Sequence, residues 1–461
     1  MATVPQNVRN PVVNCSNKLV CVQLNADSLS NKMAEFELII REYNPDIIGV
    51  SEVLPKNSRI KIYAEQFNIT GYNMIPHKNV VSNKGRGSAM YIKNSLDYKE
   101  VTFEPEKGHF EEGIFIEINT SNNEKLLCAN IYRRGESEKG VNENLLEIMR
   151  VISNRNYNHI NITGDFNLKS INWETMTTCL TDPDSYENQF IECVRDCYFT
   201  QHILEPTRQR GRDNPSCLDL VFTNNENLIE SIEIMAPLGK SDHAIVKHTL
   251  NLQTNPAPPK IKIQYEKGDY EKIKESLNEV NWGDEFSKYP DDIESQWDFF
   301  KNKLKTAEEN FIPRKNVFIN GKLSKKISLP LDRANLKKIK RKNRLWGKVR
   351  KDLASEEQKL QYNRLRNQIR RLTRKGKKLI EKNIAANSKS NPKAFWSYTR
   401  QKLKTNSSLP DLIKNEDEDQ PVYATTDESK SEVLLDYFSS VFTIEPHSEE
   451  ITFFEKRRVP V

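Results

Sequence analysis

Short apolar runs alternate with amphipathic stretches between residue 18 and about residue 252. Apolar runs of this length, bounded by polar turns, are typical of strands buried on both faces. We expect strands at KLVCVQL, DIIGVS, SAMYIK, IFIEI, LLCANIY, HINIT, LDLVFT and AIVKHTL. Two stretches place apolar side chains on one helical face, namely Met33, Phe36, Ile39 and Ile40, and then Leu145, Ile148, Met149 and Ile152. The pattern predicts one α/β domain of about 240 residues, with helices covering sheets.

The pattern changes after this domain. The segment TNPAPPKIK, around residues 254–262, clusters prolines and loses its periodicity, which is typical of a domain boundary. Residues 331–391 contain no proline and only two glycines, and their Lys-, Arg- and Leu-rich composition predicts long basic helices. The tail from about residue 409 begins with the acidic NEDEDQ and continues as SEVLLDYFSSVF, an amphipathic helix whose apolar residues need a partner surface.

These changes predict five segments. We expect a flexible N-terminus at 1–17, the α/β domain at 18–252, a linker with short helices at 253–330, a basic helical segment at 331–400 and an acidic and amphipathic tail at 401–461.

The cysteines and the apolar content restrict the kind of protein. Seven cysteines, with no CxxC pair and no matched Cys/His spacing, argue against a disulfide framework and against a zinc site. The start, MATVPQNVRN, has no apolar signal core, and no stretch approaches the roughly 20 apolar residues that would span a bilayer. We therefore expect a soluble intracellular protein of the nucleus or cytoplasm, or of both.

The net charge of +6 conceals an uneven distribution. Residues 301–400 hold 31 Lys and Arg against 7 Asp and Glu, a charge of +24, so the rest of the chain carries −18. A block of this kind indicates a polyanion-binding segment attached to a less basic domain. The alternative is a solvated helix face without a ligand.

Several predicted strands end in polar residues that phosphate chemistry uses, and those ends would lie together at one sheet edge. They are Asn25, Glu52, Tyr132, Asp165, Asn167, Asp219, Asp242 and His243. Phosphodiester cleavage needs charge neutralisation at phosphorus, a deprotonated water and a stabilised leaving oxygen. Glu52 is a natural Mg²⁺ ligand, and His243 with Asp219 could manage a proton near neutral pH.

Each residue also has an ordinary structural explanation. These are a loop carboxylate at Glu52, Asx turns at Asn25 and Asn167, a core aromatic at Tyr132 and a helix cap at residues 241–243. Asp219 fits such an explanation less well, because a charge inside an apolar run is costly unless it is paired. Together, the ordinary explanations become improbable.

The motifs resemble a known family. NADSL, SE at 51–52, GRGSAMYIK, NIYRR, GDFNLKSINW, PTR, SCLDLVFT and SDH occur in this order. The set resembles the endonuclease/exonuclease/phosphatase superfamily and, more narrowly, the endonuclease domains of metazoan non-LTR (LINE-type) retrotransposons. The resemblance covers about residues 18–252, and GDFN with SDH is its most specific pair.

The resemblance implies a four-layered α/β sandwich, two packed mixed sheets flanked by helices, followed here by a basic and mainly helical extension. It implies Mg²⁺, with Mn²⁺ as an alternative, held by Glu52 with help from Asn25. Asp165 would orient or deprotonate the water, and Asn167 would contact the scissile phosphate. His243, oriented by Asp219, would be the polarising or proton-transferring group. Asp242 would provide a second metal position or contact the water, and Tyr132 would contact the phosphate.

Two departures from the retrotransposon pattern add arginines. The usual Tyr-Arg-Pro-Pro is replaced by residues 132–135, Tyr-Arg-Arg-Gly, and Arg86 lies between two glycines. These changes put loop shape and substrate placement in doubt, while the added charge could favour phosphate contact. Our candidate nucleic-acid-binding residues are Arg133, Arg208, Arg341, Lys342, Arg344, Arg370, Arg371, Arg374 and Lys375.

The second half resembles the linker that joins such a nuclease to a reverse transcriptase, by IPRK, the basic stretch, NPKAFWSYTR and LLDYFSSVFTIE. No Tyr-x-Asp-Asp occurs and the chain ends at RRVPV, so we expect a truncated element copy without polymerase activity. The main hypothesis is an endonuclease that nicks DNA and leaves a 3′-OH for reverse transcription. The alternatives are an inactive nucleic-acid-binding remnant, or a phosphatase or exonuclease of the same fold. Expected partners are DNA and, as a second polyanion, the element RNA, with no membrane and no evident protein partner.

Overall fold

The structure is a computed structural model. It describes residues 18–57, 61–103, 112–135, 139–210, 213–255, 260–290, 292–317, 333–403, 412–413, 423–424 and 427–441. The predicted flexible N-terminus and the acidic NEDEDQ lie outside the described residues. The chain divides into two compact units, 1–398 and 399–461.

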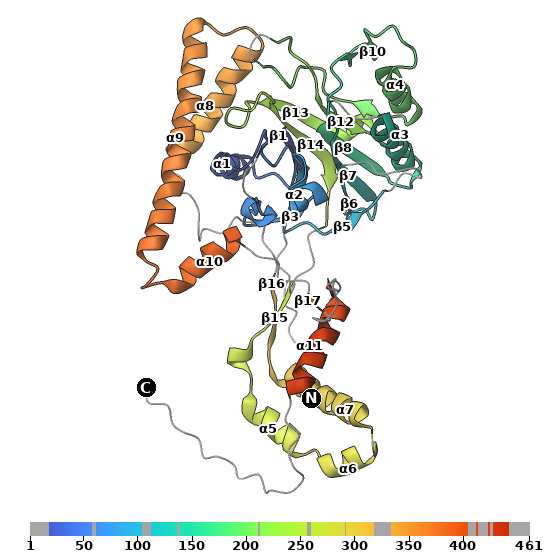
Figure 1. The fold of residues 1–461 in the computed structure, drawn as a ribbon, viewed down its shortest axis with the longest axis vertical. Coiled ribbons are helices and arrows are strands. Elements are labelled where there is room, and N and C mark those ends of the chain that lie inside the picture. The colour runs from blue at the N-terminus through green and yellow to red at the C-terminus, as the bar shows by residue number, and fades with distance from the viewer. Residues whose placement is uncertain are drawn as a thin grey trace, which may run out of the picture. The chain divides into compact units, whose positions relative to one another are not determined.

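Residues 18–255, here called the front domain, contain two six-stranded sheets (Figure 1). The first has the order β13 (Ile229–Met235), β14 (Ile245–Gln253), β1 (Lys18–Asn25), β2 (Ile47–Ser51), β4 (Ser88–Lys93) and β3 (Tyr72–Pro76). The second has the order β11 (Thr200–Gln201), β12 (Asp219–Thr223), β8 (His159–Asp165), β7 (Lys125–Tyr132), β6 (Gly113–Asn119) and β5 (Tyr98–Val101). Both sheets are mixed, because β1 with β2 and β7 with β8 are parallel pairs among antiparallel ones.

Three apolar clusters separate four layers. Side chains of both sheets, including Cys21 and Ile116, fill the space between them. Neighbouring positions such as Val22 face the other way and pack with α1 (Met33–Tyr43), and α3 (Lys139–Asn154) and α4 (Tyr186–Asp196) cover the second sheet. The predicted four-layered sandwich is confirmed, and all eight predicted strands are present. The short α2 (Lys78–Ser82) lies next to β3 and β4.

Strand pairing brings several strand ends to one edge. Asn25 pairs with Ser51, and Asp165 pairs with both Tyr132 and Asp219. The close approach of β7 and β8 requires a glycine before Asp165, since a Cβ on Gly164 would lie 1.8 Å from the backbone oxygen of Ile131. The predicted convergence of polar residues therefore follows from the sheet registers.

Residues 260–317 contain more regular structure than the predicted linker with short helices. β15 (Lys260–Ile263) pairs with β16 (Arg314–Val317), and between them lie α5 (Tyr270–Asn278), α6 (Trp282–Ser287) and α7 (Ile293–Phe311). The 19 residues of α7 make it a long helix, and its aromatic side chains contact Trp282. Aromatic residues of α6 and α7 thus pack together within this segment.

The predicted long basic helices are confirmed as α8 (Arg333–Arg350) and α9 (Glu356–Ala386), followed by α10 (Pro392–Leu403). Ser355 begins α9 with a reciprocal capping box to Gln358. The pair α8–α9, here called the basic hairpin, packs against the front domain through a buried apolar cluster that includes Leu38, Ile339 and Ile369. This docking was not foreseen from the sequence.

In the second unit, the predicted amphipathic helix is present as α11 (Asp427–Val441). It contacts a two-stranded sheet of β17 (Leu412–Ile413) and β18 (Tyr423–Ala424). None of the described helices has the length and apolar character needed to cross a membrane.

Candidate active site

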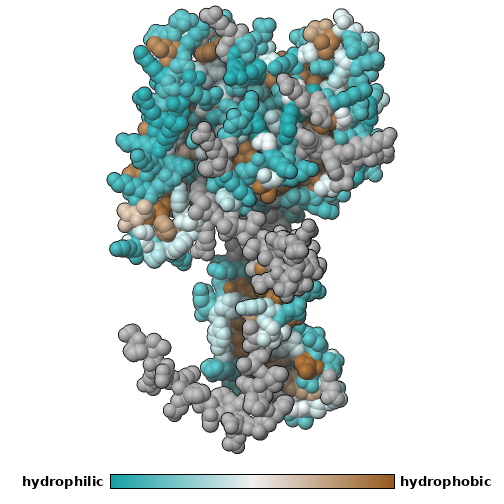
Figure 2. Space-filling model, in the orientation of Figure 1, coloured by the Kyte–Doolittle hydropathy of each residue, from teal (hydrophilic) through white to brown (hydrophobic). Residues whose placement is uncertain are grey.

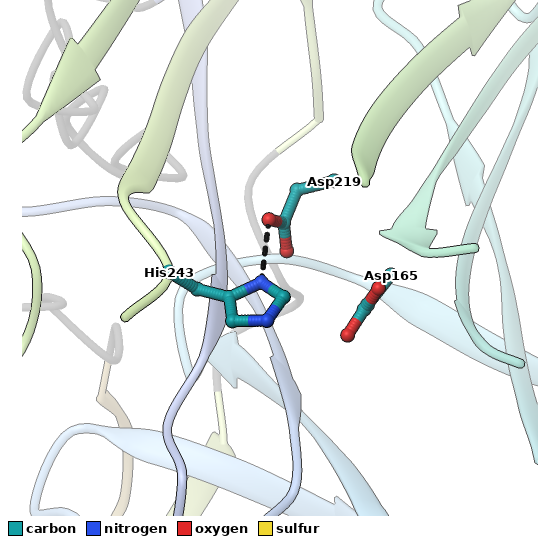
Figure 3. Close-up of side chains that lie close together, drawn as sticks. All are labelled: Asp165, Asp219 and His243. Carbon is teal, nitrogen blue, oxygen red and sulfur yellow. Dashed lines mark hydrogen bonds and ion pairs between the residues drawn. The ribbon is translucent and has the colours of Figure 1, made fainter. Parts of the chain in front are cut away.

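Two buried carboxylates and a histidine form the centre of the site. Asp165 ends β8, Asp219 begins β12, and His243 precedes β14. The Nδ1 of His243 lies 2.8 Å from Oδ2 of Asp219, and ligand atoms of all three residues lie within 4.8 Å of one another. Figure 3 shows the two carboxylates pointing toward the imidazole from neighbouring strands. The predicted pairing of His243 with Asp219 is present.

Backbone and hydroxyl contacts hold this group in place. The Nδ2 of Asn25 donates to Oδ2 of Asp165 at 2.8 Å. The hydroxyl of Thr207 accepts the backbone N–H of Asp219 at 3.0 Å, and the hydroxyl of Ser241 donates to the backbone oxygen of Asn25 at 2.9 Å. The N–H of Asp27 donates to Oδ1 of Asn25 at 2.9 Å, so an Asx turn forms there beside the Asp165 contact.

The acidic surroundings change the protonation of the group. Burial and the nearby charge of Asp219 raise the pKa of Asp165 to about 7, against the opposing effects of His243 and Asn25. Burial alone would lower the pKa of His243, but the carboxylates of Asp219, Asp165 and Asp242 raise it to about 10. At neutral pH the imidazole is therefore a cation fixed between acids, and Oδ1 of Asp219 is buried without a described hydrogen-bond partner.

Glu52 lies at the end of β2 in the left-handed region, with φ at 55°. Its Oε1 accepts a hydrogen bond from the hydroxyl of Tyr132 at 3.2 Å, and its Oε2 lies 2.9 Å from Nη2 of Arg86. The same Nη2 lies 2.6 Å from Oδ1 of Asp27. Burial, together with Glu52, Asp165 and Glu112, raises the pKa of Tyr132, which stays a donor. Two carboxylates thus converge on one cation position, where Arg86 lies.

The candidates in the NIYRR and GDFN motifs have different surroundings. The Nδ2 of Asn167 donates to the backbone oxygen of Arg133 at 2.8 Å, and Asn167 lines the open cleft. The prediction that Arg133 contacts phosphate is corrected here, because its side chain is buried. Its Nε donates to Asn142 at 2.8 Å, and its guanidinium lies 4.7 Å from the ring centre of Tyr186. Arg133 therefore supports the GDFN loop from inside.

An open cleft of about 490 Å³ lies over this centre. Five predicted site residues line it: Glu52, Asn167, Arg208, Asp242 and His243. Asn25, Asp165 and Asp219 are fully buried. The Nε of Arg208 donates to Asp242 at 3.1 Å. Six basic side chains line the cleft, against three acidic ones, which favours an anionic ligand: Lys56, Arg86, Lys169, Arg208, Arg210 and Lys240.

Sequence reasoning missed four of these cations as site residues. Lys169 lies two residues after Asn167 in GDFNLK, and Lys240 lies two residues before Asp242 in GKSDH. Their closeness to the motifs was a usable signal, because a side chain near a strand end shares its edge of the sheet. Lys56 and Arg210 lie on loops and carried no such signal.

The basic hairpin contains most of the other candidates. Arg341, Arg344, Arg371, Arg374 and Lys375 are exposed, and Arg370 is half-buried. Most of the visible surface over α9 is hydrophilic (Figure 2). The prediction that Lys342 binds nucleic acid is also corrected, because this residue is 1% exposed and its Nζ lies 2.8 Å from Oε1 of Glu35. A lysine whose charge is paired with a carboxylate in the interior is not available to bind phosphate.

A family model described as endonuclease-reverse transcriptase matches residues 126–247. The match supports the predicted resemblance of the front domain to endonuclease/exonuclease/phosphatase-type nucleases that accompany a reverse transcriptase. It includes six of the predicted catalytic and metal-binding residues: Tyr132, Asp165, Asn167, Asp219, Asp242 and His243. Asn25 and Glu52 precede the matched region, and the fold brings them to the same edge.

Three solved structures are similar to the front domain. The endonuclease domain of TRAS1, a telomere-specific non-LTR retrotransposon, is 15% identical, with 52% of this chain and 100% of that chain covered and a TM-score of 0.40. The AP endonuclease LMAP from Leishmania major is 13% identical (51% and 88% covered, TM-score 0.40), and the catalytic domain of APE2 from Xenopus laevis is 16% identical (52% and 94% covered, TM-score 0.39). A comparison with curated protein sequences finds no significant match.

The front domain offers two different groups of donors. Glu52 and Asp27 supply hard carboxylate oxygens to a position that already attracts a cation, which fits Mg²⁺ or Mn²⁺. In the buried group, one atom each of His243 and Asp219 is used in their mutual hydrogen bond, and Asp165 is bonded to Asn25. The buried group is therefore better suited to moving or holding protons, and the Glu52 position to a metal ion.

Proposed function

We propose that the front domain is a divalent-metal-dependent endonuclease of the endonuclease/exonuclease/phosphatase type, which hydrolyses DNA phosphodiester bonds and leaves a 3′-OH. The observation that supports this most is the cationic His243, held by Asp219 beneath a cleft whose lining is mainly basic. A phosphate drawn into the cleft would reach the imidazole and Asn167 together. In the intact retrotransposon family, such a nick would prime reverse transcription, and the site of action would be the nucleus.

The buried group suggests how the water would be activated. Asp165, held by Asn25 and with a pKa near 7, would orient an attacking water and accept its proton. His243 would donate from its free Nε2 to a phosphoryl oxygen, while Asp219 keeps the ring oriented and charged. Asn167 would contact the scissile phosphate through its amide.

The outer group would manage the remaining charge. Glu52, with Asp242 and the nearby Asn25 as the other candidates, would hold Mg²⁺ or Mn²⁺, whose charge would stabilise the phosphate and the leaving 3′-oxygen. The hydroxyl of Tyr132 would keep Glu52 in its left-handed conformation and lie close to the phosphate. Arg86 would have to share Glu52 with the metal ion or turn toward the phosphate.

The exposed cations of the basic hairpin would hold the DNA on either side of the cut, or the element RNA, through phosphates. Contacts of this kind carry no base specificity and weaken steeply with salt. The candidates are Arg341, Arg344, Arg370, Arg371, Arg374 and Lys375, with Arg208 in the cleft itself.

Nicking of supercoiled plasmid by the full chain tests the proposal. We expect relaxation with Mg²⁺ or Mn²⁺ and none with EDTA, and we expect DNA ligase to reseal the product, because ligase requires a 3′-OH. His243→Ala and Glu52→Gln should abolish nicking. His159→Gln is the matched control, because this histidine also pairs with a carboxylate, Glu124, but lies outside the cleft.

Two other outcomes would contradict the proposal. Salt-sensitive DNA binding without nicking would indicate the inactive remnant. Release of terminal phosphate or nucleotides without nicking would indicate a phosphatase or exonuclease of the same fold.

A further inference from the structure

The helix α8 is fixed to the front domain by buried polar contacts as well as by apolar packing. The Nζ of Lys342 lies 2.8 Å from Glu35 on α1 and 3.1 Å from the backbone oxygen of Pro237. Asn343 donates to the hydroxyl of Tyr43 at the end of α1. A buried ion pair with an added hydrogen bond is geometrically restrictive, so α8 is held in a defined position.

That position places the end of α8 against two loops of the active site. Arg350 forms an ion pair with Glu205, which lies three residues before Arg208. Pro237, which accepts from Lys342, lies five residues before Asp242. The loops meet where Arg208 donates to Asp242. The basic hairpin therefore lies next to the cleft.

A second pocket, of about 250 Å³, lies between α8 and these loops. Its lining is Glu205, Pro206, Thr207, Arg208, Gln209, Pro215, Pro237, Asp242, Trp346, Val349, Arg350 and Lys351. Arg208 and Asp242 also line the cleft, so the two spaces are adjacent.

The chemistry of this pocket differs from that of the cleft. Proline rings, Val349 and Trp346 give it apolar walls, and the guanidinium of Arg350 lies 5.4 Å from the ring centre of Trp346. Such walls suit the flat apolar face of a nucleobase, which also stacks on guanidinium planes. Lys351 and Arg208 provide positive charge for the attached phosphates, and the amide of Gln209 can reach a base edge.

We propose that this pocket binds the nucleobase of a nucleotide next to the phosphate held in the cleft. The inference rests on the proposed nucleic-acid substrate, but it adds a subsite built by the basic hairpin. A base must leave the duplex stack to enter the pocket, so the subsite favours nucleotides that are unpaired or weakly stacked. Binding is tolerant of base identity, because stacking surfaces read a π-face rather than a hydrogen-bond pattern.

Equilibrium binding to short oligonucleotides tests the subsite without requiring catalysis. The ligands are a short thymidine oligomer and the same oligomer with an abasic residue at each position in turn. Binding is measured by fluorescence anisotropy with EDTA present. For the wild-type chain and for Trp346→Phe, we expect one abasic position to weaken binding about tenfold, and for Trp346→Ala less than twofold.

A second variant guards against loss of the docked helix. Val349→Phe keeps α8 apolar but places a ring in the pocket, and it should also remove the abasic penalty while leaving thermal stability close to that of the wild type. The inference is overturned if the penalty persists unchanged in Trp346→Ala and Val349→Phe. The wild-type chain could also fail to nick plasmid while the abasic penalty disappears in Trp346→Ala and Val349→Phe. That result would support the subsite and reject the proposed nuclease function.

Discussion

Two buried ion pairs, one at the strand-end edge of the front domain and one under the basic hairpin, have similar geometry and different surroundings. In His243–Asp219 and in Lys342–Glu35, a buried cation lies 2.8 Å from a buried carboxylate oxygen. The first has a further carboxylate, Asp165, beside it and an open cleft above it. The second pairs one positive with one negative charge, has an added backbone acceptor and is surrounded by an apolar cluster.

The difference shows what distinguishes a functional charge from a structural one in this protein. Excess acid around His243 raises its pKa, and Oδ1 of Asp219 has no hydrogen-bond partner among the described residues. Both features mark a site built for more than holding the fold. In the pair under the hairpin, Nζ of Lys342 donates to both Glu35 and the backbone oxygen of Pro237, and the role of the pair is to fix α8.

Asp219→Asn should cause the largest loss. The amide keeps the size of the side chain but no longer favours the cationic, correctly oriented imidazole of His243, so the single-turnover nicking rate should fall about 10³- to 10⁴-fold. The thermal midpoint should change little. A rate within tenfold of the wild type would show that the pair has no catalytic role.

Lys342→Met should reduce stability rather than chemistry. The change leaves Glu35 buried without its cation, which should cost about 3–5 kcal/mol in the free energy of unfolding measured with urea. The double variant Lys342→Met with Glu35→Leu should recover most of this loss, because no uncompensated charge remains. Failure of the double variant to recover stability would show that the interface depends on the ion pair itself.

His248 is a third kind of buried histidine, which has no carboxylate partner among the described residues. Its Nε2 lies 3.1 Å from Oδ1 of Asn161, and burial with the nearby His202 lowers its pKa to about 3. Above pH 6.5 the residue is neutral in both states. As the pH falls from 6.5 toward 3, the unfolded chain gains a proton that the folded chain does not, so stability is lost, by about 2 kcal/mol at pH 5.

The measurement is urea unfolding at pH 7 and pH 5. His248→Gln retains a donor toward Asn161 but cannot titrate, so its stability should fall less between these two pH values. An equal fall in both proteins would assign the acid sensitivity to other groups.

Arg371→Ala should have the smallest effect. This residue is exposed on α9, so its removal should reduce the slope of log K against log salt concentration by about 1 and weaken DNA binding uniformly across sequences. The double variant Lys342→Met with Glu35→Leu should leave the slope unchanged, because Lys342 is already neutralised in the interior. A change of slope in that variant would contradict the interior role of Lys342.

The strands of the front domain could be predicted because each is a continuous apolar run. The four strands of the two sheets that were not predicted, β3, β5, β11 and β13, are largely half-buried or exposed and contain polar residues. Sheet edges tolerate such patterns, so the apolar signal is diluted there. The prediction of convergence at the site succeeded because parallel and antiparallel registers bring motif residues to one edge.

The errors concern charges whose partners are distant in sequence. Lys342 and Glu35 are separated by 307 positions, and no local pattern connects them. Arg133 looked like an added phosphate contact, but its partners belong to α3 and the GDFN loop. A count of basic residues indicates the electrostatic potential around a segment, while burial decides which of these residues can contact a ligand.

The docked hairpin also changes what counts as a separable piece of this protein. The proline-rich segment after residue 253 looks like a natural place to cut, yet a fragment that ends there would uncover Glu35 and the apolar surface around Leu38. Residues 18–255 and the hairpin far downstream therefore share one buried interface. Expression of the domain for biochemical work should therefore retain α8 and α9, or replace the uncovered surface with polar residues.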